Sequence, residues 1–115
     1  MLKREDDYNL PDEAKNLIIP KNSIFSSTIR FTIMMILNTH KKAKFTEFQK
    51  LLHLTSGNLN HHLQKLIDKG FVLKKQGIFP RRVLTYVTIT KKGEQKFLLY
   101  INKIQEILNK AGSSN

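Results

Sequence analysis

The side chains with the clearest chemistry lie in the segment LTSGNLNHHLQKLIDKGFV, residues 54–72. Its leucines recur at helical spacing. The opposite side of that helix carries hydroxyl, amide, imidazole and amine groups, with Asp68 as the one acidic side chain. His62 falls at the edge of the apolar stripe, where a packed or capping histidine is expected. The candidate binding residues are Thr55, Ser56, Gly57, Asn58, Asn60, His61, Gln64 and Lys65.

These groups match the chemistry of base edges in the major groove of DNA. That groove is about 12 Å wide and admits one α-helix, and its pattern of donors and acceptors distinguishes the base pairs. Asn and Gln can bond adenine through two hydrogen bonds, whereas Lys and His can donate to guanine. Gly57 lets the backbone approach closely, and Thr55 and Ser56 can bind phosphate at the helix N-terminus. We therefore expect a recognition helix over residues 55–69; the alternative is an ordinary solvated helix face.

A second basic cluster follows in residues 71–90, where β-branched and aromatic residues predict two strands joined by the turn GIFPRR. Arg81 and Arg82 at the end of this turn are expected to contact phosphates or a narrow minor groove. Lys74 and Lys75 are neighbours in the first predicted strand. Adjacent strand residues point to opposite faces, so only one of these lysines should face a duplex. Ile78 and Phe79 at the tip could cover the core, contact a partner subunit or pack on sugars, and the sequence does not decide between these roles. The basic residues are Lys74, Lys75, Arg81 and Arg82.

The distribution of charge supports a polyanionic partner. The chain has 20 Lys and Arg against 9 Asp and Glu, a formal net charge of +11. Residues 55–92 contain eight basic side chains against Asp68 alone, whereas residues 1–15 contain three basic and five acidic ones. A concentrated basic region most often binds nucleic acid. The alternative is a basic protein with solubilising lysines.

Other classes of function lack the residues that they need. Acid–base catalysis needs converging carboxylates or a His–carboxylate pair, and only Glu47 and Asp68 occur between residues 14 and 93. The adjacent His61 and His62 project about 100° apart on a helix, and the chain has no cysteine, so neither a metal site nor a cofactor is expected. No apolar run approaches the length of a membrane span. We expect a non-enzymatic cytoplasmic, nucleoid-associated protein with no membrane partner.

The order of elements gives the architecture. Residues 1–22 should form an arm with one helical turn in DEAKNLI, residues 23–111 a single domain, and residues 112–115 a flexible tail. Helical spacing predicts a helix over residues 23–40 with Ser23 as N-cap, a short helix in TEFQKLLHL with Thr46 in a capping box, and the recognition helix ending at Gly70. After the hairpin comes a long helix from the N-cap Thr90 to about Gly112. The fold class is mainly α with a small β-hairpin.

Two helices have more apolar surface than so small a domain can easily cover. The first helix is apolar nearly all round in its second half, and the last has an apolar heptad seam. If each of these helices packed against the same helix of a second subunit, both excess apolar surfaces would be buried in one isologous interface. We therefore predict a homodimer formed by residues 23–38 and 94–111. The residues assigned to this interface are Phe31, Met34, Met35, Phe97, Ile101, Ile104 and Leu108.

The sequence resembles the winged helix–turn–helix transcriptional regulators of the MarR and ArsR-like group. The resemblance covers residues 23–108 and rests on LTSGNLNHHLQKL, on the GFV that enters the hairpin, and on the spacing of Thr90 and Gly93. It implies a winged helix with a dimerisation helix, and a dimer that binds operator DNA at an inverted repeat. The metal-sensing members bind through cysteines that this chain lacks. A small-molecule effector is left open.

The favoured function is thus a sequence-specific regulator that binds double-stranded DNA, with its recognition helix in the major groove and a basic wing, residues 74–82, on the backbone or minor groove. An architectural protein that coats duplex without sequence preference would use the same basic surface and the same dimer. A protein-interaction module is a third hypothesis, which the charge of the helix and hairpin disfavours.

Overall fold

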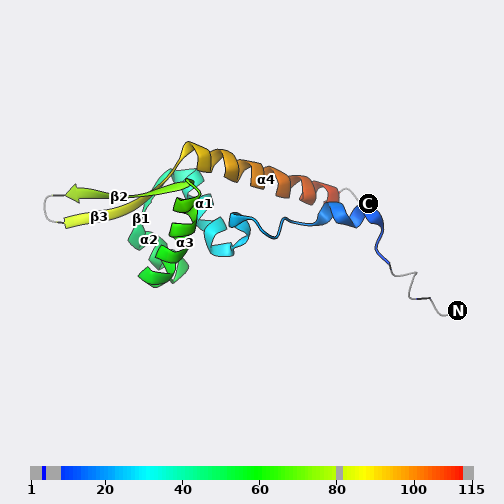
Figure 1. Ribbon diagram of the computed structural model, residues 1–115, viewed down its shortest axis with the longest axis horizontal. Coiled ribbons are helices and arrows are strands. Elements are labelled where there is room, and N and C mark those ends of the chain that lie inside the picture. The colour runs from blue at the N-terminus through cyan, green and yellow to red at the C-terminus, as the bar shows by residue number, and fades with distance from the viewer. Residues whose placement is uncertain (1–3, 5–8, 80–81, 113–115) are drawn as a thin grey trace.

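The computed structural model describes residues 4, 9–79 and 82–112 and places them in a mainly helical fold with one small sheet (Figure 1). The predicted fold class, a winged helix with a long final helix, is confirmed. The elements in chain order are the 3-10 helices η2 (Asp12–Leu17) and η3 (Ile24–Ser26), α1 (Thr28–His40), β1 (Lys42–Lys44), α2 (Phe45–Leu52), α3 (Ser56–Asp68), β2 (Val72–Phe79), β3 (Arg82–Ile89) and α4 (Lys91–Gly112).

The first long helix begins later than predicted. Ser23 caps the short helix η3, where its side chain accepts a hydrogen bond from the Phe25 N–H at 3.1 Å. The Ser26 hydroxyl donates back to the Ser23 carbonyl at 2.7 Å, which closes that turn locally instead of extending it. The chain then restarts at Ser27, whose side chain accepts from the Arg30 N–H and caps α1.

Helix α2 also starts at a different residue from the one predicted. Its N-cap is Lys44, which makes no side-chain capping bond, and Thr46 lies inside the first turn. The predicted capping box is therefore wrong. Lys44 is the last residue of β1, so the strand leads directly into the helix and leaves no extended residue at Thr46 to act as a cap.

Helix α3 has the ends that the sequence predicted. The Thr55 hydroxyl accepts from the Asn58 N–H at 3.1 Å. At the other end the Phe71 N–H donates to the Leu66 carbonyl at 3.0 Å, the six-residue bond of a Schellman motif. Gly70 has a φ of 76°, a conformation that costs glycine no steric clash with a Cβ atom. The chain therefore turns sharply from α3 into β2.

Helices α1, α2 and α3, the inner side of the sheet and Phe97 of α4 form one hydrophobic core. The members that are at most 1% exposed are Ile33, Met34, Leu37, Phe48, Leu59, Leu63, Leu66, Val72, Val87 and Phe97. Met34 and Phe97 therefore belong to the core of one protomer, which corrects their assignment to a subunit interface. The apolar residues of α1 pack against α3, β3, η3 and Phe97 of α4, which accounts for its wide apolar surface within one protomer. Phe31 packs edge-on against Phe97, with ring centroids 5.5 Å apart.

The sheet has three antiparallel strands in the order β1-β3-β2. Ala43 of β1 pairs with Val87 of β3, so a short segment between the first two predicted helices forms the third strand of the sheet. The hairpin is longer than predicted, because the register pairs Phe79 with Arg82 and takes most of GIFPRR into the strands. The connection, residues 80–81, lies outside the described part of the chain.

The wing and α4 are joined at a compact junction built around Thr90. Its hydroxyl donates to the Gly70 carbonyl at 2.6 Å and accepts from the Gly93 N–H at 2.9 Å, and its own N–H donates to the Phe71 carbonyl at 3.0 Å. Gly93 packs directly on the Phe71 backbone, where any side chain would overlap the carbonyl oxygen. The predicted N-cap at Thr90 is confirmed, and the same residue ties the start of α4 to the end of α3.

Helix α4 leaves this junction and runs away from the sheet, so the hairpin and α4 project from the helical core in opposite directions (Figure 1). The single turn predicted in DEAKNLI is the 3-10 helix η2, which lies against α4. Helix α4 continues through Gly112, where the flexible tail was predicted to begin; residues 113–115 lie outside the described chain. Two parts of the molecule are thereby separated: α3 with the wing at one end, and α4 with the arm at the other.

The junction gives a first prediction. Gly93→Ala should destabilise the protein by about 1–3 kcal/mol, because the added methyl has no space beside the Phe71 carbonyl. Gly57→Ala is the control, since nothing lies within 4 Å of a Cβ at that helical position. Urea unfolding followed by circular dichroism measures both variants. Equal stability of the Gly93 variant and the wild type would contradict this role of the junction.

Candidate nucleic-acid interface

The polar side of α3 is open to solvent along its length. All eight residues predicted for this surface are exposed, while Leu59, Leu63 and Leu66 on the opposite side are buried. The first turn presents backbone N–H groups next to its N-cap residue, Thr55, and this arrangement favours anions. Nothing lies within 4 Å of a Cβ built on Gly57, so the backbone there can approach another molecule closely.

The wing is joined to this helix through one lysine. Lys74 of β2 donates from Nζ to Oδ1 of Asn60 at 2.8 Å, and its ammonium group lies 5.1 Å from the centre of the Phe45 ring. This lysine therefore contacts both α3 and α2. Because it holds the oxygen of the Asn60 amide, the NH₂ group of that amide is left to donate. Gln64 donates to Asp68 at 2.7 Å, one turn further along the helix.

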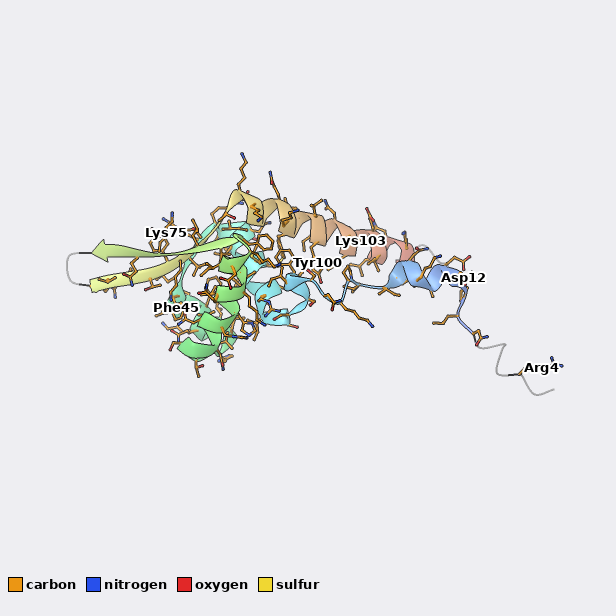
Figure 2. The ribbon with its side chains drawn as sticks, viewed as in Figure 1. Arg4, Asp12, Phe45, Lys75, Tyr100 and Lys103 are labelled. Carbon is orange, nitrogen blue, oxygen red and sulfur yellow. The ribbon has the colours of Figure 1, made fainter. Side chains whose placement is uncertain are left out.

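Lys75 lies on the other face of the sheet. It pairs with Tyr86, whereas Lys74 pairs with Val87, whose side chain is buried in the core. Figure 2 shows Lys75 and Phe45 on opposite sides of the hairpin. Of the two lysines, Lys74 therefore lies on the side of the sheet that faces α3. That only one of them faces a duplex stays a prediction. Arg82 is exposed at the start of β3, and Arg81 lies outside the described residues.

One contact that the sequence did not predict holds α3 from its other flank. Nη1 of Arg30 in α1 lies 3.0 Å from Nδ1 of His62, and Nε of the same arginine donates to the Ile24 carbonyl at 2.7 Å. His62 is thus the packed histidine that the sequence predicted. Arg30 could have been noticed as the one basic side chain in the first three turns of an otherwise apolar helix.

The electrostatics of this contact favour the neutral imidazole. Burial lowers the pKa of His62 below 6.5, and the positive charge of Arg30 lowers it further, with smaller effects from His61 and Lys65. The neutral ring can accept the hydrogen bond from Arg30 at Nδ1, whereas a protonated ring would place two cations in contact. The contact therefore weakens when His62 is protonated.

The residues predicted for dimerisation divide into two groups. Besides the buried Met34 and Phe97, Ile101 and Phe31 are partly buried and pack on the core of their own protomer. Ile104 is partly exposed, while Met35 is 43% and Leu108 57% exposed. Further apolar side chains are also exposed on α4 and the arm: Leu10, Leu17, Ile18, Ile19, Leu98 and Leu99.

Within the described residues, no three His, Cys, Asp or Glu side chains are grouped closely enough to hold a metal ion. In that same part of the chain, no helix combines the length and hydrophobicity needed to cross a bilayer. An exposed helix of amide and basic side chains, flanked by a basic hairpin, instead defines a DNA-binding winged helix.

Comparison with known proteins places the chain in a family. Residues 29–108 match the winged helix DNA-binding domain family, and the chain belongs to it. An uncharacterized protein of Methanocaldococcus jannaschii is 39% identical over 84 residues, which cover 73% of this chain and 91% of that protein. The family consists of DNA-binding regulators and not of enzymes.

Solved structures agree with this assignment. A transcriptional regulator homologue from Pyrococcus horikoshii OT3 superposes with a TM-score of 0.74 at 29% identity, covering 88% of this chain and 98% of that one. The structure of MarR has a TM-score of 0.63 at 17% identity, covering 75% of this chain and 62% of MarR, and it shows the fold alone. The resemblance to winged-helix regulators is confirmed, and the protein is a winged helix DNA-binding transcriptional regulator homologue.

The Arg30–His62 contact gives a second prediction. Since the pKa of His62 is lowered by folding, the unfolded chain binds that proton more readily, and the associated stability is present above about pH 6.5 and is lost as the pH falls toward the folded pKa. His62→Gln keeps an acceptor for Arg30 but does not titrate. Its free energy of unfolding should fall less between about pH 7.5 and 5.5 than that of the wild type.

Urea titrations of the wild type and the His62 variant at the two pH values measure this difference. Identical pH dependence in the wild type and the His62 variant would show that His62 titrates alike in the folded and unfolded chains.

Proposed function

We propose that this protein is a sequence-specific regulator that binds double-stranded DNA as a homodimer. The observation that carries the proposal is the exposed polar side of α3, which Lys74 and Arg30 hold from its two flanks without covering it. A helix held in this way presents amide, hydroxyl and basic groups in a fixed arrangement. Fixed donors and acceptors discriminate between base pairs better than mobile ones, because less side-chain freedom is lost on binding.

In this proposal α3 enters the major groove with its N-terminal turn leading. Asn60 and Gln64 are the amides that contact base edges, and Thr55 and Ser56 bind phosphate near the helix N-terminus. Gly57 lets the backbone approach, Asn58, His61 and Lys65 flank the amides, and Lys74 supports Asn60. In the wing, Arg81 and Arg82 contact the sugar–phosphate backbone or the adjacent minor groove. Lys75, on the other face of the sheet, takes no part in this contact.

The dimer completes this arrangement, because one winged helix contacts only a short half-site. In a two-fold dimer two recognition helices lie about 34 Å apart, one turn of DNA. The surface that supports a dimer is the exposed apolar side of α4, with Leu108 and the partly exposed Ile104, extended by Leu17, Ile18 and Ile19 of the arm. An isologous interface would bury these side chains against their symmetry mates. Such a regulator acts in the cytoplasm, associated with the nucleoid.

An architectural protein without sequence preference is the second candidate. It would use the same net charge and the same dimer, and would derive its affinity from phosphate contacts alone. The number of amide groups on the exposed side of α3 favours a sequence-specific protein, because amides add little to phosphate binding but discriminate well between bases.

A third prediction separates these two functions. Asn60→Ala and Gln64→Ala should each cost about 1–3 kcal/mol on the preferred duplex and much less on random duplex, because each removes a base contact. Gln95→Ala removes an exposed amide from α4 and should leave both affinities unchanged. Fluorescence anisotropy with two labelled duplexes measures the difference. Equal losses on both duplexes would favour the architectural protein.

A fourth prediction concerns assembly. Ile104→Asp combined with Leu108→Asp should produce monomers, because two carboxylates cannot be buried at an apolar interface without partners. These positions test the dimer better than Ile101, which packs on the core of its own protomer. The control, Asn102→Asp with Asn109→Asp, adds the same charge at exposed positions on another side of α4. Sedimentation at micromolar concentration should give a dimer for the wild type and the control. A wild type that sediments as a 13.4 kDa monomer would contradict the dimer.

A further inference from the structure

Two amide side chains on the exposed side of α3, Asn60 and Gln64, are each bonded to a charged neighbour. An amide without a partner offers an acceptor oxygen and a donor NH₂ group, and nothing in the residue itself selects which of them faces a base. A charged neighbour removes this freedom. A lysine ammonium group only donates and a carboxylate only accepts, so the neighbour determines which end of the amide it holds.

The neighbour of Asn60 is Lys74, which donates from Nζ to Oδ1 at 2.8 Å. The ammonium group also lies 5.1 Å from the centre of the Phe45 ring, and this cation–π contact helps to keep it beside Asn60. The NH₂ group of Asn60 stays free to donate. A base amino group that approached the second lone pair of Oδ1 would lie against the ammonium group. Asn60 and Lys74 together therefore form a positively charged pair of donors.

The neighbour of Gln64 has the opposite charge. Nε2 of Gln64 donates to Oδ1 of Asp68 at 2.7 Å, one turn further along α3. This bond uses one of the two N–H groups and leaves Oε1 free to accept. Donation to a carboxylate polarises the amide and makes its oxygen a stronger acceptor. The negative charge of Asp68 also disfavours a base edge that presents only acceptors.

The base edges in the major groove differ in the same way. Guanine presents two acceptors, N7 and O6, whereas adenine presents the acceptor N7 beside the N6 amino group. We propose that Lys74 and Asp68 determine which base each amide contacts. Asn60 contacts guanine, because the donors of Asn60 and Lys74 meet two acceptors there. Gln64 contacts adenine, whose N6 donates to Oε1 while the remaining N–H of Gln64 donates to N7.

Residue type alone does not distinguish the two positions, because asparagine and glutamine are both suited to adenine. The charged neighbours make the two positions opposite in preference. Four residues along a helix span about 6 Å, and successive base pairs lie about 3.4 Å apart, so the two bases should be about one or two base pairs apart in each half-site. The inference rests on the proposed function, since it names the bases that α3 contacts.

The first experiment uses the full chain without DNA. NMR spectra of isotope-labelled protein resolve the side-chain NH₂ groups of asparagine and glutamine. Lys74→Met has no donor but a side chain of similar length, and it should shift the signal of Asn60 while that of Asn102 on α4 stays unchanged. The matched control is Lys75→Met, which removes the same charge from the other face of the sheet. An Asn60 signal that Lys74→Met does not shift would overturn the contact and the inference with it.

The second experiment measures base preference. Fluorescence anisotropy is recorded with the preferred duplex and with duplexes in which one base pair is changed in both half-sites. The pair that Asn60 contacts is the one at which Asn60→Ala no longer discriminates. In the wild type it should be G·C, favoured about tenfold over A·T. Lys74→Met should bring this ratio close to one, whereas Lys75→Met should keep it.

The pair that Gln64 contacts is located with Gln64→Ala in the same way, and should be A·T. Asp68→Ala frees the amide of Gln64 and should weaken the preference for A·T at that pair. Glu106→Ala removes an exposed acidic side chain from α4 and should leave the preference unchanged. A G·C pair at this position, or a preference that Asp68→Ala does not alter, would overturn the role of Asp68.

The outcomes distinguish this inference from the proposed function. An A·T pair at the Asn60 position of the wild type, or the same ratio in Lys74→Met as in the wild type, would overturn the role of Lys74 and leave the sequence-specific regulator standing. Equal affinity of the wild type for every duplex would overturn the proposed function and the inference together.

Discussion

The packing of Gly93 against the backbone of Phe71 is the constraint on which the rest of the structure depends. Four elements meet there: the end of α3, the start of β2, the end of β3 and the start of α4. The Thr90 hydroxyl donates to the Gly70 carbonyl and accepts from the Gly93 N–H, which caps α4, while the Thr90 backbone N–H donates to the Phe71 carbonyl. A side chain at Gly93 would push α4 away from α3. This contact fixes the direction of α4 relative to α3, and in the proposed dimer that direction sets where the partner subunit places its recognition helix.

The same rigidity extends to the polar side of α3. Lys74 holds it from the wing, and Arg30 holds it from α1 through His62. Lys74 engages only Oδ1 of the Asn60 amide and Arg30 contacts His62, so the outer surface of the helix stays open to solvent.

Much of this structure could be predicted because its signals are local. The spacing of leucines in α3, the cap at Thr55, the glycine at position 70 and the Thr90 cap each depend on a few neighbouring residues. The errors arose where tertiary contacts decide. Met34 and Phe97 looked like surplus apolar surface, but η3 and α4 cover α1 within one protomer. Strand β1 has three residues and no alternation of its own, so only its pairing with β3 defines it. The contact of Arg30 with His62 joins helices distant in sequence, and no spacing along the chain marks such a contact.

Selection from a library of random duplexes, followed by affinity measurements on the enriched sequence, tests the central claim most directly. That claim is that two copies of α3, held at a fixed separation, contact bases at specific positions. The account predicts an enriched inverted repeat whose half-sites are centred about 34 Å apart, bound far more tightly than a scrambled duplex of the same composition. A library that returns no enriched sequence, with equal affinity for selected and scrambled duplexes, would contradict it.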